Sequence, residues 1–352
     1  MDFNEKSADE LAGIGAEAQA TYEGIRGRNL ALDMTRGKPA PDQLDLSNGI
    51  LTVVGPGDTD GDDGTDYRNY GILSGIPEAK ALFAEYMEVA PAEIIVGGNS
   101  SLTMMYDTIV GGMLFGMPGG SAPWGDQGSV IFICPVPGYD RHFAICERLG
   151  VGMVAVPMTP DGPDMDAVEA LVADDASVKG IWCVPKYSNP SDEVYSDDVV
   201  DRLANMQVAA PDFRVIWDNA YNVHHIGEGP APLKNLLAAC KNAGTPDRVL
   251  MFGSTSKLTL PGAGVAVLAA SEANIQDALK KNVLFRYRPG QNQPTSPCPF
   301  LQGHGWAACS YGCPGGDHRS EICGRRRCSS APVGGQGDCQ MDITEGRLFR
   351  QC

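Results

Sequence analysis

The sequence predicts an α/β protein in which a mainly parallel sheet lies between two layers of helices, the three-layer α/β/α arrangement. Short, β-rich apolar runs alternate along the chain with longer stretches of helical periodicity, which is typical of a parallel sheet covered on both faces. The length of 352 residues and the apolar fraction of 43% are sufficient for a large packed core.

The predicted elements follow one another in a regular order. Helices are expected over residues 8–28, 99–114, 138–150, 164–175 and 196–206, and strands over residues 93–97, 129–137, 152–158, 179–185, 213–218, 248–254 and 264–271. In such sheets, ligands bind at the carboxyl ends of the strands. The polar residues just after each apolar run are therefore the candidate site residues.

Charge and cysteine content restrict the partners and the compartment. The formal net charge of −17 argues against nonspecific binding to nucleic acid or to anionic membranes. No apolar run is long enough for a membrane span, and the start, MDFNEKSADE, lacks the features of a secretory signal. Four dispersed cysteines before residue 286 are typical of buried thiols in a cytosolic protein, so a cytoplasmic location is expected.

One loop, residues 55–66 (GPGDTDGDDGTD), has the acidic composition of a calcium site. Asn69 stands where a glutamate should close a twelve-residue EF-hand loop, so a solvated turn is expected instead. The sequence predicts no metal site.

Polar residues of distinctive type follow several of the apolar runs. Glycines and hydroxyl residues at 97–101 open a predicted helix, which suits phosphate binding or ordinary N-capping. Tyr139 follows another run, as a stacking group or a packed rim residue, and Asn189 precedes a proline that holds it extended. Asp218 ends an apolar run and, if buried, needs a cationic or N–H partner. Lys257 lies in FGSTSKLTLPGAG, among hydroxyl residues and without acidic neighbours.

The order of these motifs resembles that of the fold-type I pyridoxal-phosphate enzymes, and more narrowly the class I aminotransferases of the aspartate aminotransferase group. The motifs are Tyr70-x-x-x-x-Gly75, GGNSS, PGY, SNP, DNAY and STSK. The stretches DMTRGKPAPDQLDLSNG, NYGILSGIPEAK, CVPKYSNP and STSKLTLPGAGVA are similar to a bacterial subgroup of that family. The resemblance spans roughly residues 15–285.

The resemblance implies pyridoxal 5′-phosphate as cofactor and assigns the catalytic roles. Lys257 would form the Schiff base with the cofactor aldehyde and then shuttle the proton between the substrate and the cofactor. Asp218 would pair with the pyridinium nitrogen. Asn189 and Tyr221 would hydrogen-bond the phenolic oxygen of the ring, on which Tyr139 would stack.

The resemblance also implies a phosphate site, a substrate site and a second subunit. The phosphate would be held by Gly98, Asn99, Ser100 and Ser254. Tyr70 matches a tyrosine that reaches the phosphate of the neighbouring subunit, so a homodimer is expected. Gly37 and Asn189 would lie near the substrate carboxylate.

Two positions depart from the family pattern. Gly264 stands where the family commonly has an arginine that neutralises the phosphate, so another cation or local dipoles must hold that group. The usual Asn-Pro-Thr-Gly turn is Asn189-Pro190-Ser191-Asp192, a change expected to reshape the loop without abolishing cofactor binding.

The predicted domains are an N-terminal arm with the start of a small domain (1–50), a large cofactor-binding domain (51–285) and a tail (286–352) that does not resemble the family. The tail has eight Arg, no Lys and seven of the eleven cysteines. A zinc or disulfide module is one explanation, although its C-x3-C and C-x4-C spacings lack the regular pairing of known zinc folds. In place of the tail, the family has a small domain whose arginine binds the substrate α-carboxylate.

A shifted reading frame is the other explanation for the tail. With free third bases, moving YRPGQNQPTSPCPF forward by one base permits IGPDKINQLRHVRF, and QMDITEGRLF permits KWTSPKGGYF. Both strings resemble the family sequence. We hypothesise a shift between about residues 280 and 287, which the DNA sequence of that region decides. A shifted tail would have no selected core and is predicted to be poorly ordered.

The predicted function is an aminotransferase that moves an amino group between an amino acid, aspartate or glutamate, and a 2-oxo acid. Turnover is expected to be low because the arginine for the substrate carboxylate is missing. The alternatives are another fold-type I reaction, such as β-elimination, or a non-catalytic domain that binds the cofactor.

Overall fold

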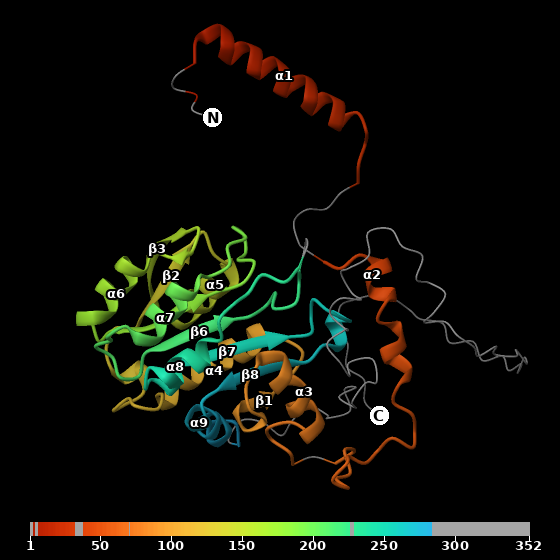
Figure 1. Ribbon diagram of the computed structural model, residues 1–352, viewed down its shortest axis with the longest axis vertical. Coiled ribbons are helices and arrows are strands. Elements are labelled where there is room, and N and C mark those ends of the chain that lie inside the picture. The colour runs from red at the N-terminus through yellow and green to blue at the C-terminus, as the bar shows by residue number, and fades with distance from the viewer. Residues whose placement is uncertain (1–2, 4–5, 32–37, 70, 226–228, 284–352) are drawn as a thin grey trace, which may run out of the picture. The chain divides into compact units, whose positions relative to one another are not determined.

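The computed structural model describes residues 3, 6–31, 38–69, 71–225 and 229–283. The predictions for Gly37 and Tyr70, and those for the tail 286–352, fall outside the described residues. Within the described part of the chain, strands and helices alternate as the sequence predicts (Figure 1).

The helices and strands have the following bounds. The helices are α1 (Ala8–Arg26), α2 (Pro41–Asp45), α3 (Pro77–Met87), α4 (Ser101–Phe115), α5 (Asp140–Leu149), α6 (Met165–Asp174), α7 (Asp197–Asn205), α8 (Leu236–Asn242) and α9 (Glu272–Val283). The strands are β1 (Ile94–Val96), β2 (Ile131–Val136), β3 (Gly152–Thr159), β4 (Gly162–Pro163), β5 (Val178–Cys183), β6 (Arg214–Asp218), β7 (Val249–Ser254) and β8 (Ala266–Ala270).

The strands form one sheet in the order β1-β8-β7-β6-β5-β2-β3-β4. Strand β8 runs antiparallel to both of its neighbours, and β4 runs antiparallel to β3. The other six strands share one direction, so their carboxyl ends lie along the same edge of the sheet. The mainly parallel sheet of the prediction is thereby confirmed.

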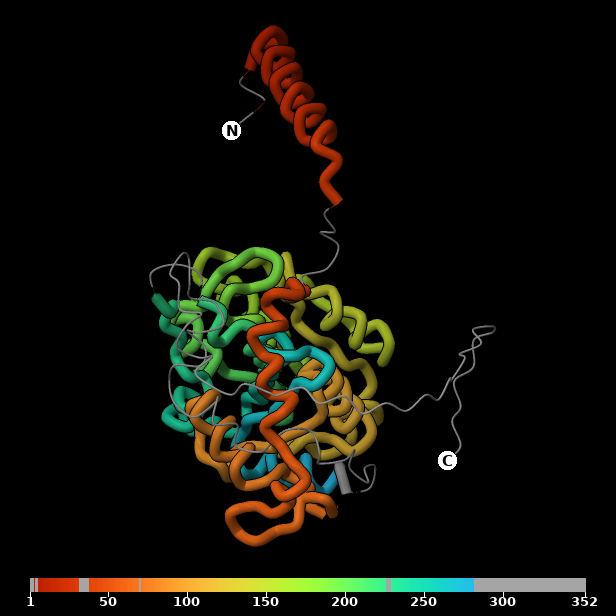
Figure 2. The backbone as a smooth tube through the Cα atoms, turned by 90° about the vertical axis from the view of Figure 1, so that its right-hand side faces the viewer, coloured from red at the N-terminus to blue at the C-terminus, as the bar shows by residue number. Residues whose placement is uncertain are grey.

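The core has two parts, one on each face of the sheet. Alternate residues of β6 point to opposite faces: Val215 and Trp217 pack in one cluster with α3, α6, α7 and α8, while Ile216 packs in the other with α4, α5 and α9. Each fully buried aliphatic side chain stabilises the fold by about 1.5–3 kcal/mol relative to an exposed one. The tube in Figure 2 gives a second view of these helices and the sheet.

Local signals in the sequence set the start of α4 and the end of α5. Ser100 caps α4, and its side chain accepts a hydrogen bond from the Thr103 amide at 3.3 Å. Helix α5 ends at Gly150, which adopts the left-handed conformation (φ 68°) that glycine tolerates best. These ends fix where the chain enters and leaves the sheet.

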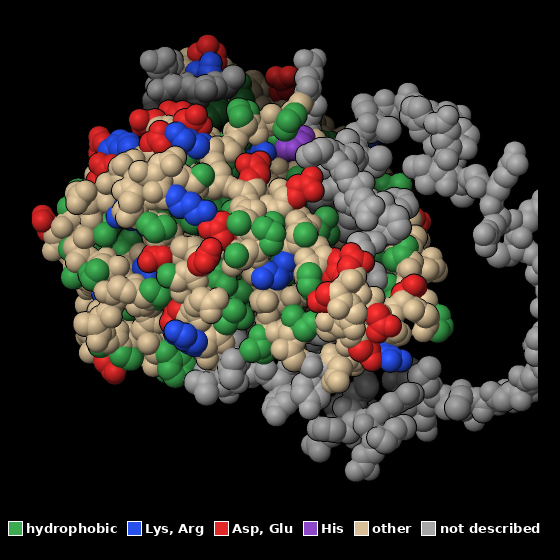
Figure 3. Space-filling model, turned by 60° about the horizontal axis from the view of Figure 1, so that its bottom comes forward, with side chains coloured by type: hydrophobic (Ala, Val, Ile, Leu, Met, Phe, Trp, Pro, Cys, Tyr) green, Lys and Arg blue, Asp and Glu red, His purple; other side chains and the backbone are tan. Residues whose placement is uncertain are grey.

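The surface shown in Figure 3 carries acidic and basic side chains interspersed with apolar and uncharged ones. No helix in the described residues has both the length and the apolar character needed to cross a bilayer.

Candidate cofactor site

The predicted site residues lie along the edge of the sheet where the parallel strands end. Asp218 is the last residue of β6 and Ser254 the last residue of β7, and these two strands pair directly, with Asp218 opposite Phe252. Tyr139 follows β2, and the loop with Asn189 follows β5. The topology therefore brings residues separated by more than a hundred positions to one edge.

Asp218 is a buried carboxylate that is only half satisfied. It is 4% exposed, and its Oδ2 lies 3.0 Å from Nε2 of His142. Its Oδ1 is buried and has no hydrogen-bond partner among the described residues. A buried carboxylate oxygen without a donor is costly, by about 1–3 kcal/mol, so this atom is suited to accept a proton-bearing group from a ligand.

Lys257 and Tyr221 lie against each other. The ammonium nitrogen of Lys257 is 3.8 Å from the centroid of the Tyr221 ring, within the range of a cation–π contact. The Lys257 carbonyl lies 3.2 Å from Nε2 of His224. Burial, together with the charge of Lys257, lowers the pKa of His224 to about 4, so this imidazole is neutral at pH 7 and its Nε2–H can donate to the carbonyl.

The residues predicted to bind phosphate form a connected loop at the start of α4. The loop is tied to the start of β8 by two backbone bonds, from the Gly97 amide to the Ala266 carbonyl (2.7 Å) and from the Ala266 amide to the Gly98 carbonyl (2.6 Å). The Ser256 hydroxyl donates to the Asn99 carbonyl at 2.7 Å. The structure thereby joins the Gly98-Asn99-Ser100 segment to the Ser254–Ser256 segment.

Ser254, the last residue of β7, lies in the segment that is joined to this loop. Its hydroxyl accepts a bond from the Ser256 amide at 3.4 Å. The amides at the start of α4 and the dipole of that helix favour an anion, and the surrounding hydroxyls can donate to it.

The position with the missing arginine borders the same hydroxyl groups. A Cβ atom added at Gly264 would lie 3.3 Å from both the Ser256 and the Thr255 hydroxyl oxygens. Thr255 is itself engaged, since its hydroxyl accepts a bond from the Val265 amide at 2.9 Å. Gly264 therefore allows this turn to pack closely against the hydroxyls of the loop.

Tyr139 and Asn189 line a small cavity of about 20 Å³ together with His142, Trp182 and Ser188. Burial, and then the charge of Asp218, raise the pKa of Tyr139, which is consistent with a neutral phenol close to that carboxylate. The turn after Asn189 is closed by a bond from the Ser188 amide to the Glu193 carbonyl at 2.9 Å.

His142, whose imidazole bonds the Asp218 carboxylate, was not predicted from the sequence. His142 is 1% exposed and lies on α5, three residues after Tyr139. The missed signal was a histidine in the first turn of a helix that begins at a strand end.

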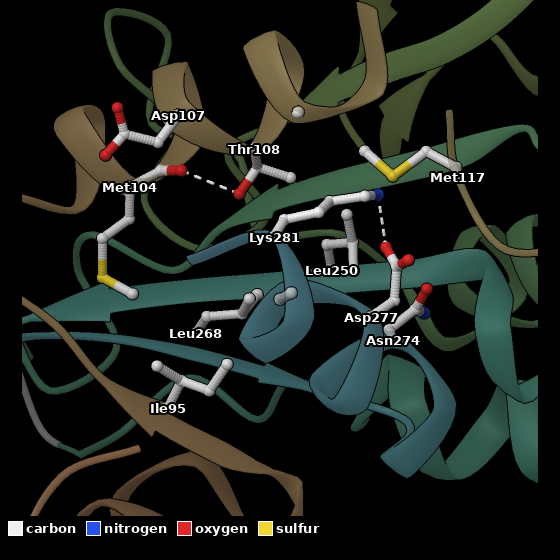
Figure 4. Close-up of a pocket in the computed structure, with 12 residues that line it drawn as sticks. Ile95, Met104, Asp107, Thr108, Met117, Leu250, Leu268, Asn274, Asp277 and Lys281 are labelled. Carbon is white, nitrogen blue, oxygen red and sulfur yellow. Dashed lines mark hydrogen bonds and ion pairs between the residues drawn. The ribbon is translucent and has the colours of Figure 1, made fainter. Parts of the chain in front are cut away.

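Another cavity, of about 70 Å³, lies between α4 and α9 (Figure 4). Apolar side chains such as Ile95, Leu250 and Leu268 line it. The ammonium of Lys281 bonds the carboxylate of Asp277 and, at 2.5 Å, the carbonyl of Gly116. Because Lys281 and Asp277 are paired with each other, this cavity offers less for catalysis than the strand-end site.

No three His, Cys, Asp or Glu side chains converge as metal ligands do in the part of the chain that the structure describes. The strand-end site instead combines protein groups that suit an organic, phosphate-bearing cofactor. They are a carboxylate, a lysine, aromatic rings, hydroxyls and a helix N-terminus.

A three-layer α/β/α fold with a lysine and a buried aspartate at adjacent strand ends defines the class of the pyridoxal-phosphate-dependent transferases. Residues 6–294 match the model of the aspartate aminotransferase family, and the chain belongs to that family.

Its relatives include two curated proteins. A Mycolicibacterium smegmatis protein named as an aminotransferase is 48% identical over 282 residues, which are 80% of this chain and 66% of the relative. The aspartate aminotransferase of Corynebacterium glutamicum is 44% identical over 274 residues, 78% of this chain and 62% of the relative. The chain thus spans slightly less than two thirds of the length of these relatives.

The fold is also similar to a solved structure. The crystal structure of an aspartate transaminase from Corynebacterium glutamicum superimposes with a TM-score of 0.82 at 38% sequence identity, covering 88% of this chain and 73% of the other. This similarity confirms the predicted fold class.

Proposed function

We propose that the chain is the cofactor-binding part of a pyridoxal-phosphate-dependent aminotransferase that acts on aspartate or glutamate and a 2-oxo acid. The observation that carries this proposal is Asp218, with one carboxylate oxygen fixed by His142 at 3.0 Å and the other buried without a partner among the described residues. A protonated ring nitrogen is the group that satisfies such an oxygen.

The residues present fit pyridoxal phosphate. Asp218 would face the pyridinium N–H, Tyr139 the ring, and the α4 N-terminus with its hydroxyls the phosphate. When bound, the cofactor supplies an aldehyde that condenses with amines and a ring that accepts the electron pair released at the substrate Cα.

The chain's own residues have separate tasks in the reaction. The Lys257 amine would hold the cofactor between turnovers and then carry the proton of the substrate Cα. The Tyr221 ring keeps the lysine ammonium within 3.8 Å of its centroid, and the Tyr221 hydroxyl and Asn189 amide would donate to the ring oxygen. Asp218 and His142, both almost fully buried, would keep the nitrogen of the cofactor ring protonated.

The proposal of aspartate or glutamate as the substrate is supported by a relative. No contact among the described residues bears on the choice of substrate. The Corynebacterium glutamicum relative is named an aspartate aminotransferase, at 44% identity. A family dimer, in which Tyr70 would reach the phosphate of a second subunit, belongs to the same proposal.

The proposal is tested by adding pyridoxal phosphate to the purified chain and recording the visible absorption of the lysine-bound cofactor. Wild-type protein is expected to give the band, and Lys257→Ala to lose it. Lys280→Ala, which removes an exposed lysine of α9, is the matched control for nonspecific attachment and should retain the band. Borohydride reduction followed by peptide mapping should place the label on Lys257, and a label elsewhere would refute the assignment.

Amino-donor screening then separates the reactions. Transfer from aspartate or glutamate to a 2-oxo acid supports an aminotransferase, whereas release of ammonia without transfer supports an eliminating enzyme. A second candidate, a chain that binds the cofactor without turnover, is favoured by the family match, which ends at residue 294 of 352. Cofactor binding with no reaction of any donor would support that candidate.

A further inference from the structure

His142 is held behind Asp218 by the flat face of a tryptophan. The imidazole of His142 and the indole of Trp182 are stacked, with centroids 4.4 Å apart and planes inclined by 10°. Because an ionised carboxylate only accepts, Nε2 of His142 must carry the proton that it shares with Asp218 at 3.0 Å. The plane of Trp182 therefore decides how that N–H is aimed.

Trp182 is itself oriented by Cys146. The indole Nε1–H donates to Sγ of Cys146 at 3.3 Å, and both residues are buried, at 2% and 1% exposure. Cys146 lies four residues after His142 on α5, so the two side chains share one face of that helix. One helix thus presents the histidine and also the acceptor that fixes the ring packed on it.

The Cys146 sulfur is well suited to be this acceptor. The thiol of Cys134, on strand β2, donates to the carbonyl of Phe132 at 3.8 Å, so its proton is not directed at the Cys146 sulfur. Without this sulfur, the Trp182 indole would be a buried N–H with no acceptor among the described residues.

We propose that Cys146 is a positioning residue for the strand-end site. Through Trp182, it holds the His142 imidazole in the plane that keeps the Nε2–H of His142 directed at Asp218. The role of Asp218 toward the cofactor rests on the proposed function, whereas the orientation of His142 does not. The competing explanation is that Cys146 only fills space in the core.

The orientation is measured by ¹⁵N NMR of the histidine side chains in the full chain without cofactor, at one mildly alkaline pH. The His142 signals are assigned by their loss in His142→Gln. Cys146→Ala is expected to shift and broaden them, because the indole N–H loses its acceptor. Cys146→Ser keeps an acceptor and should leave them close to wild type.

The coupling through Trp182 is tested by a double-mutant cycle. Trp182→Phe keeps a stacking ring but has no N–H, so Cys146→Ala should cause no further shift of His142 in that background. Cys240→Ala is the matched control, because Cys240 is a fully buried thiol on α8 that lies in the other core cluster. It is expected to lower stability and leave the His142 signals in place.

Two results would overturn the proposal: unchanged His142 signals in Cys146→Ala, or an equal shift with and without the Trp182 indole. With pyridoxal phosphate added, Cys146→Ala should also move the pH midpoint of the visible band, which Cys240→Ala should not. If no variant binds the cofactor, the proposed function fails while the NMR cycle still decides the role of Cys146.

Discussion

Two buried carboxylates flank strand β6, Asp218 as its last residue and Asp212 two residues before its start, and their hydrogen bonding differs. At the carboxyl end, Asp218 has one oxygen bonded by His142 and one with no partner among the described residues. At the amino end, Asp212 receives the Lys179 ammonium at 2.7 Å on one oxygen, and the Trp124 indole (3.0 Å) and Gln127 amide (3.1 Å) on the other.

The difference in hydrogen bonding distinguishes a carboxylate that stabilises the fold from one that is suited to bind a ligand. Asp212 is 1% exposed and completely satisfied, so nothing in its surroundings calls for a ligand. Asp218 is about as buried, yet its Oδ1 has no donor in the part of the chain that the structure describes, and it ends the strand that pairs with β7, which leads to Lys257. We infer that incomplete bonding, more than burial or charge, distinguishes the site from the rest of the polar core.

The largest effect is expected from Asp212→Ala, which leaves the Lys179 ammonium buried without its counter-ion. Breaking such a pair costs about 3–5 kcal/mol of unfolding free energy, measurable by urea denaturation. Lys179→Met together with Asp212→Leu removes both charges and should recover the part of that loss caused by the unpaired ammonium, but not the part caused by the Trp124 indole, which still lacks its acceptor. A loss of unfolding free energy below about 1 kcal/mol for Asp212→Ala would contradict the stabilising role of this buried ion pair.

The same pair predicts a pH dependence. Burial alone would raise the pKa of Asp212, but the bond from Lys179, aided by Gln127, outweighs it and the pKa is lowered. A lowered folded-state pKa contributes stability above the unfolded value of about 3.9, and this contribution is lost as the pH falls through the folded value. The stability difference between wild type and Asp212→Asn should therefore narrow in acid below about pH 4.

Asp218→Asn should have the opposite effect to Asp212→Ala, with little change in stability and a large loss of cofactor binding. Its amide oxygen can still accept from His142, so the unfolding free energy without cofactor should change by less than about 1 kcal/mol. With cofactor at a hundred times its dissociation constant, wild type should gain about 2.7 kcal/mol and the variant much less. Equal stabilisation of both proteins by pyridoxal phosphate would contradict the role of Asp218.

A matched pair of glycines sharpens the contrast further. A Cβ at Gly120 would approach Oδ2 of Asp212 to 2.7 Å, where that atom is already held by two donors. Gly120→Ala should therefore cost about 1–3 kcal/mol of stability. At Gly264 a Cβ would meet the hydroxyls of Ser256 and Thr255 at 3.3 Å and the Cα of Ser256 at 3.4 Å, so Gly264→Ala should instead weaken cofactor binding by about fivefold, or about 1 kcal/mol. Thermal denaturation and cofactor titration distinguish the two outcomes.

The sequence predicted the fold and the carboxyl-edge residues because their signals are local. Asp218 ends an apolar run and Lys257 follows another, and parallel topology alone brings such strand ends together. The roles of these residues remain proposals, and Tyr70 and Gly37 lie outside the described residues.

The polar network of Asp212 could not be predicted in the same way. Its donors, Trp124, Gln127 and Lys179, come from two segments between 33 and 88 residues away from Asp212. Each looks like an ordinary residue in its own segment, and only packing brings them together. The stacking of His142 on Trp182, 40 positions along the chain, was missed for the same reason.

The smallest effect is expected at Gly111, on α4, the helix that begins at the phosphate loop and ends five residues before Gly120. A Cβ there would have the Lys281 side chain as its nearest neighbour, at an ordinary 3.6 Å (Figure 4 shows the cavity it borders). Because glycine inside a helix is destabilising, Gly111→Ala should raise the unfolding free energy by about 0.5–1 kcal/mol. Cofactor affinity should not change, since the helix is stiffened without altering either end. A loss of affinity in this variant would mean that α4 transmits changes between the two edges, and that the cofactor site and the structural network are not independent.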